Sequence, residues 1–180
     1  RTGTYSLSTL HDANGLPFPD AQIAGNGAND FTATVLASPG DVNGDGREDF
    51  LVGRAGKIHL VYGTDSSLVR STGSFTGVFQ PDFDLNHNEI SGVTITPGGA
   101  YACSGAGDFD GDGYDDFLIA VKPSGSTGIV YLIYGGQDLG SGFSLSTVGT
   151  SVRGMALARN SGQGSFGFPV APAGDVNGDG

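Results

Sequence analysis

The sequence has one cysteine, no tryptophan, few basic residues and no long apolar run. Because Cys103 is alone, an intramolecular disulfide framework is excluded. No stretch reaches the roughly 18 apolar residues that a transmembrane helix needs, so this segment is expected not to insert into a membrane. Lysine and arginine number 8 against 19 acidic residues, which gives a net charge of -11. This composition lacks an extended basic surface, and nucleic acid is therefore not an expected partner.

The acidic residues are gathered in three short segments rather than scattered. Only two of the 19 are glutamate, and aspartate favours loops because its side chain competes for nearby backbone hydrogen bonds. The segments begin at Asp41, Asp108 and Asp175, so that successive starts lie 67 residues apart in both steps. A fixed long period is typical of repeat architectures.

Short β-type runs recur around each acidic segment. A run of small residues precedes each one, at 33–38, 100–104 and 167–171. Two apolar runs follow each complete one, at 50–53 and 57–63, then at 117–120 and 128–135. A fourth element, of the form aromatic-Ser-Leu-Ser-Thr, occurs at 5–10 and 143–148, with a weaker version at 83–85. Such runs, bounded by glycine, are typical of strands, and no window shows the apolar period of a helix.

These runs predict an all-β fold built of β-propeller blades, each with four antiparallel strands. We expect the last strand of a preceding blade at 1–10, one blade at 31–85, a second at 99–148 and the start of a third at 165–180. A β-sandwich is the main structural alternative, but it does not explain a loop repeated at identical spacing. A propeller needs about four to eight blades to close, and this sequence accounts for about two and a half. We therefore expect it to be an incomplete part of a larger propeller, or to pair its blades with other chains.

Each acidic segment has the spacing of an all-oxygen metal cage. Aspartate or asparagine stands at positions 1, 3 and 5, aspartate at position 9, and glycine at position 6 permits the tight turn. Position 7 would offer its backbone carbonyl. Such cages suit Ca²⁺, and we expect one structural Ca²⁺ per complete loop. The candidate ligands are Asp41, Asn43, Asp45, Arg47 and Asp49 in the first loop, Asp108, Asp110, Asp112, Tyr114 and Asp116 in the second, and Asp175, Asn177 and Asp179 in the third, which lacks positions 7 and 9.

An EF-hand loop and a metal-free turn are the alternative interpretations of these segments. An EF-hand requires a glutamate at position 12, where this chain has Val52 or Ile119, so that interpretation fails. The loops could also be metal-free turns rich in aspartate and asparagine. Several acids within nine residues repel one another unless something neutralises them. Three copies at equal spacing therefore favour the metal.

At these positions the chain resembles the FG-GAP repeat family, which provides the blades of integrin α-subunit propellers. The matching strings are 40–53, 107–119 and 166–180, although the Phe-Gly pair occurs only at 166–167. The style of the repeat is similar to bacterial secreted repeat proteins. The resemblance implies a structural calcium on the face opposite the ligand site. It also implies that ligands contact the turns at 54–56 and 122–127, joined by connections at roughly 11–30, 86–98 and 149–164.

We therefore expect a calcium-binding propeller segment of an extracellular protein, secreted or on the cell surface. Its role would be adhesion or partner binding, with a protein or glycan ligand. A carbohydrate-binding (lectin-like) propeller and the scaffold blades of a secreted enzyme are the alternatives. The expected ligand-face loops are poor in aromatic residues, which counts against the lectin-like alternative. No acid–base cluster stands outside the acidic loops, so we expect no enzyme. Cys103 is predicted to be a small buried hydrophobe, and His59 a strand residue that faces solvent.

Overall fold

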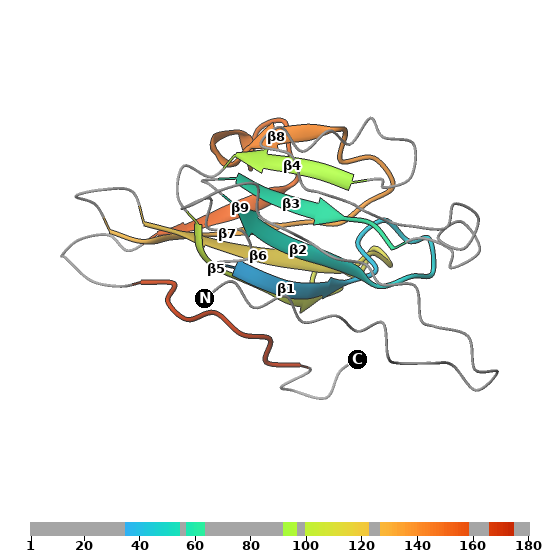
Figure 1. Ribbon diagram of the computed structural model, residues 1–180, viewed down its shortest axis with the longest axis horizontal. Coiled ribbons are helices and arrows are strands. Elements are labelled where there is room, and N and C mark those ends of the chain that lie inside the picture. Colours follow the sequence, from blue (N-terminus) through green and yellow to red (C-terminus); the bar gives the residue numbers. More distant parts are fainter. Residues whose placement is uncertain are drawn as a thin grey trace, which may run out of the picture.

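The computed structural model describes residues 35–54, 57–63, 92–96, 100–122, 127–158 and 166–174. Within these ranges the chain forms strands and one 3-10 turn (Figure 1), which confirms the all-β fold class. The strands form two sheets that do not close into a ring, as expected of incomplete propeller blades. In the described part of the chain, no helix is long and apolar enough to cross a membrane.

The first sheet contains five strands in the order β1-β2-β3-β4-β8. The first four strands pair antiparallel, whereas β8 adds to β4 in parallel. The strands are β1 (Val35–Gly40), β2 (Asp49–Arg54), β3 (Lys57–Val61), β4 (Gly92–Thr96) and β8 (Gly142–Ser144).

The second sheet repeats the four-stranded antiparallel unit of the first, in the order β5-β6-β7-β9. In both sheets the first strand runs into an acidic loop, the second strand begins at position 9 of that loop, and the third follows a short turn. The strands are β5 (Ala100–Gly107), β6 (Asp116–Val121), β7 (Ile129–Ile133) and β9 (Gly154–Ala158).

The two sheets share one hydrophobic core. The middle strands supply most of it, because their β-branched and aromatic residues are covered on both faces. Phe117 in β6 is its largest fully buried side chain. The first strands of the sheets meet at Gly105 of β5, where a Cβ atom would lie 3.0 Å from the carbonyl oxygens of Ser38 and Pro39. Glycine thus permits the close approach of β1 and β5, which lie side by side in Figure 1.

The prediction of a fourth strand at 143–148 is wrong. Only its start is extended, since Leu145–Thr147 form the 3-10 turn η1, and β8 pairs with β4 of the first sheet rather than with β7. The fourth strands are β4 and β9, which lie in segments predicted to be connections, so both sheets continue past residues 85 and 148. Both β8 and β9 follow β7 in the chain, and their patterns do not specify which sheet each one joins. Backbone pairing between distant segments decides it.

The strand predicted before the third acidic loop is not formed. Residues 167–171 were expected to form a strand, but residues 166–174 form none, and no strand of the described residues pairs with them. Phe168 in this segment is 62% exposed. The segments predicted at 1–10, 11–30 and 83–85, and the third acidic loop from Asp175 onward, lie outside the described residues.

The burial of His59 and Cys103 can be compared with what the sequence predicts. The prediction that His59 faces solvent is wrong: it is 2% exposed, and its ring Nδ1 lies 3.2 Å from Thr94 Oγ1 in β4. Alternation along β3 does not produce an exposed face, because the strand is buried on both sides apart from its first residue. Cys103 in β5 is partly buried against the core, as expected of a small hydrophobe. Burial raises the pKa of its thiol to about 12, which disfavours the reactive thiolate.

We predict that Phe117→Ala lowers the free energy of unfolding by about 3–5 kcal/mol, because it removes a fully buried aromatic side chain and leaves a cavity in the shared core. Equilibrium urea unfolding followed by circular dichroism measures this change. Leu36→Ala is the matched control, since Leu36 is 65% exposed on β1, and its effect should stay within about 0.5 kcal/mol. Equal effects of the two substitutions would contradict the described core.

Candidate functional site

The candidate site is the acidic loop that joins β5 to β6. Its turn is built around the carboxylate of Asp108 at position 1, which accepts N–H groups from Gly111, Asp112 and Gly113 at 2.8, 3.0 and 2.9 Å. At position 5, Asp112 Oδ1 accepts the N–H of Tyr114 at 3.2 Å. These local bonds fix the loop backbone around the Asp108 carboxylate.

The loop that joins β1 to β2 has the same construction. Asp41 at position 1 accepts the N–H groups of Asp45 and Gly46 at 3.0 and 2.8 Å. Asn43 Oδ1 at position 3 accepts the Asp45 N–H at 3.1 Å. Asp45 Oδ1 accepts the N–H of Arg47 at 3.0 Å. The repeated spacing in the sequence therefore gives a repeated turn.

The position-9 aspartates are buried and bind two distant parts of the backbone. Asp116, fully buried, accepts the N–H groups of Phe109 and Gly135, both at 2.8 Å. Burial raises the pKa of Asp116 above its ordinary value, although these two N–H groups lower it. Asp49, 2% exposed, likewise accepts N–H groups from Val42 and Gly63 at 2.9 and 2.8 Å, and burial raises its pKa too. Each aspartate thus ties the start of its loop to the residues after the third strand.

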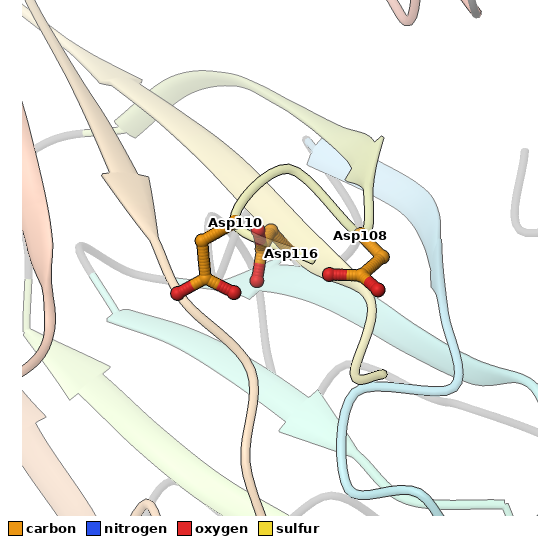
Figure 2. Close-up of side chains that lie close together, drawn as sticks. All are labelled: Asp108, Asp110 and Asp116. Carbon is orange, nitrogen blue, oxygen red and sulfur yellow. The ribbon is translucent and has the colours of Figure 1, made fainter. Parts of the chain in front are cut away.

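Three carboxylates of the second loop converge on one small space. Asp108, Asp110 and Asp116 each offer an oxygen atom, and these atoms all lie within 4.8 Å of one another. Figure 2 shows the three side chains on the same side of the loop. Two oxygens that each lie about 2.4 Å from one Ca²⁺ can be at most about 4.8 Å apart. The donor set and its spacing therefore fit a calcium ion at positions 1, 3 and 9.

The remaining predicted ligands are arranged differently. Among the described residues, the carboxylates of the first loop form no equally close group. Asp112, at position 5 of the second loop, is directed to Arg153, whose guanidinium Nη1 lies 2.7 Å from its Oδ2. This hydrogen bond lowers the pKa of Asp112 below its ordinary value. Asp175, Asn177 and Asp179 lie outside the described residues.

The two loops are joined through Asp115, which the sequence interpretation did not single out. Its Oδ2 accepts the N–H of Asp41 at 2.7 Å, and its own N–H donates to the Asp41 carbonyl at 3.0 Å. Gly40 has a φ of 100° and lies against the Asp115 carboxylate, where a Cβ atom would overlap it. Both loops carry an acidic residue at position 8, Glu48 and Asp115. This recurrence is the sequence feature that could have pointed to a role for Asp115.

These observations define the class: an all-β protein whose repeated four-stranded antiparallel units each carry an acidic loop before the second strand. Residues 41–119 match the model of a family described as FG-GAP-like repeat. The match begins at position 1 of the first loop and ends in β6, so it includes both complete loops. This segment is an FG-GAP-like repeat, and the resemblance found in the sequence is confirmed. No curated protein matches the chain.

We predict that Asp115→Ala destabilises the protein by about 1–3 kcal/mol, because it removes the carboxylate that accepts the Asp41 N–H between the two loops. Thermal unfolding in the presence of EGTA isolates this effect from any metal. Glu48→Ala is the matched control, since Glu48 occupies position 8 of the first loop and is exposed. If both variants unfolded at the wild-type temperature, the contact between the loops would have no energetic role.

Proposed function

We propose that the loops at 41–49 and 108–116 bind structural Ca²⁺ in a propeller segment of an extracellular protein, and that this protein serves adhesion or partner binding. The observation that carries the proposal is the group formed by Asp108, Asp110 and the buried Asp116, whose oxygens lie within 4.8 Å of one another. A buried carboxylate beside two others is costly without a cation.

The chemistry of the donors favours calcium over other divalent ions. The candidate ligands are carboxylate, amide and carbonyl oxygens, whereas zinc sites use histidine and cysteine. Calcium takes about six to eight oxygens in an irregular shell, and magnesium demands a smaller, regular octahedron. In the second loop, Asp108, Asp110, Asp112 and Asp116 would hold the ion, with the carbonyl of Tyr114.

The ion would supply charge neutralisation and a cross-link within the loop. Residues of this chain connect the loop to its surroundings: Asp116 joins it to the end of β7 through Gly135, and Asp115 joins it to the first loop. A ligand that binds only the folded state stabilises that state by RT ln(1 + [Ca]/Kd). Millimolar calcium outside cells would fill even weak sites of this kind.

The end of the sheets opposite the calcium loops is the proposed place for a protein or glycan partner. At the loop end, carboxylates and backbone groups are bonded within the molecule, as at Asp116 and Asp115. Lys122 directly follows β6 at the other end, is exposed, and offers a positive charge on a strongly acidic protein. One expected part of the ligand face is revised: the 149–153 turn lies at the calcium-loop end, since Arg153 contacts Asp112. The role proposed is binding rather than catalysis.

We predict that calcium at about 100 times its Kd stabilises the chain by about 2.7 kcal/mol per site, which corresponds to a rise in Tm of about 5–10 °C. Thermal unfolding in calcium, in magnesium and in excess EGTA measures it. Asp108→Ala should remove the contribution of the second loop, whereas Asp138→Ala, an acid outside the loops, should leave it unchanged. A folded protein whose Tm is the same in calcium and EGTA would refute the calcium sites.

We also predict that partner binding requires calcium and is sensitive to substitution at the end opposite the loops. Binding of the chain to a glycan array and to an array of purified extracellular proteins is measured in calcium and in EGTA. Lys122→Glu should reduce binding at least several-fold, while Asp138→Ala should not, because Asp138 lies near the loop end. Binding that ignored Lys122→Glu and EGTA would contradict this placement, and the absence of any bound partner would refute a binding role.

A further inference from the structure

The positively charged side chain of Arg153 lies against the carboxylates of the second loop. Its Nη1 lies 2.7 Å from Asp112 Oδ2 and its Nη2 lies 2.5 Å from Asp110 Oδ2, so one guanidinium joins positions 3 and 5. Asp112 is correspondingly missing from the group of carboxylates that converge at Asp116. The arginine therefore holds two of the four acidic side chains that a metal in this loop would use.

The position of Arg153 is fixed by the fold. Its carbonyl accepts the N–H of Tyr134 at 3.2 Å, and its guanidinium lies 5.6 Å from the centre of the Tyr134 ring. A tight turn precedes it, in which Thr147 accepts the N–H of Val152 at 3.1 Å and Val148 packs in the core. The guanidinium is thus presented to the loop from a separate, anchored segment, 41 residues from Asp112 in the sequence.

We infer that Arg153 competes with the proposed calcium ion for Asp110 and Asp112 and thereby sets the affinity of the second loop. This inference rests on the proposed function. A cation bound among these carboxylates would lie close to the guanidinium, and like charges repel. To use the same carboxylate oxygens, the ion must displace the arginine. Binding would then release the residue that directly precedes β9.

A comparison of the loops gives this arrangement a rationale. The second loop has four carboxylates at positions 1, 3, 5 and 9, whereas the first has three and an asparagine at position 3. In each loop the position-5 aspartate faces an arginine. Asp45 Oδ1 lies 3.8 Å from Nη1 of Arg47 in the same loop, whereas Asp112 pairs with Arg153, which lies outside its loop. The more acidic loop therefore receives its positive charge from a distant segment.

The test is calorimetric titration with Ca²⁺ alone, in a chain where the first and third loops are disabled by Asp41→Ala, Asp45→Ala and Asp175→Ala. In this background Arg153→Gln should tighten calcium binding by about tenfold. Arg153→Lys, which keeps the charge without the two-pronged contact, should give an intermediate Kd. Lys122→Gln is the matched control: it removes one positive charge at the far end of β6 and should leave Kd unchanged.

A second measurement separates competition from a merely structural role. Because Arg153 is exposed, salt should screen its charge. The ratio of the calcium Kd with Arg153 to the Kd of the Arg153→Gln variant should therefore shrink as KCl rises from about 0.02 to about 1 M. An Arg153→Gln chain, folded by circular dichroism, that binds calcium equally or more weakly would overturn the inference and leave the calcium site intact. If neither the unaltered chain nor Arg153→Gln binds calcium, the proposed function fails, and the inference fails with it.

Discussion

The structure depends on a buried carboxylate at the first residue of the second strand in each sheet. Asp49 and Asp116 each accept two backbone N–H groups, one from the start of the acidic loop and one from the residue that follows the third strand. One side chain thus closes the loop and ties it to the sheet. Burial disfavours the charged form of both carboxylates, as their raised pKa indicates. A cation next to a buried carboxylate stabilises that charged form, so burial makes a neighbouring cation favourable.

The contact between the sheets follows from where these loops lie. Asp115 of the second loop binds the backbone of Asp41 in the first, and the N–H of Gly136 donates to the carbonyl of Val42 at 2.8 Å. Val42 is fully buried by this packing, whereas Phe109, its counterpart in the second loop, is 63% exposed. The difference is what a stack of blades produces, since each blade covers the loop of the one before. In the described residues, no third sheet covers Phe109.

The loops also combine rigidity with electrostatic tuning. Backbone N–H groups donate to the position-1 carboxylates Asp41 and Asp108 and orient them within each turn. The position-5 carboxylates each accept a backbone N–H group and also face an arginine, Arg47 in the first loop and Arg153 in the second. The acidic charge of a loop is therefore balanced partly by its own chain. A protein with a net charge of -11 needs such balancing wherever its acids are concentrated.

The sequence by itself determined the all-β class, the first three strands of each sheet, and the turn chemistry of both complete loops, because these depend on residue types at short, fixed spacing. Only the tertiary structure decided which segments complete the sheets: β9 pairs with β7, and β8 pairs with β4 of the other sheet. It also decided that His59 is buried, that Asp115 joins the loops, and that Arg153 lies on Asp112. These contacts join residues that local pattern cannot pair, since their partners lie tens of positions away and are chosen by the packing of whole sheets.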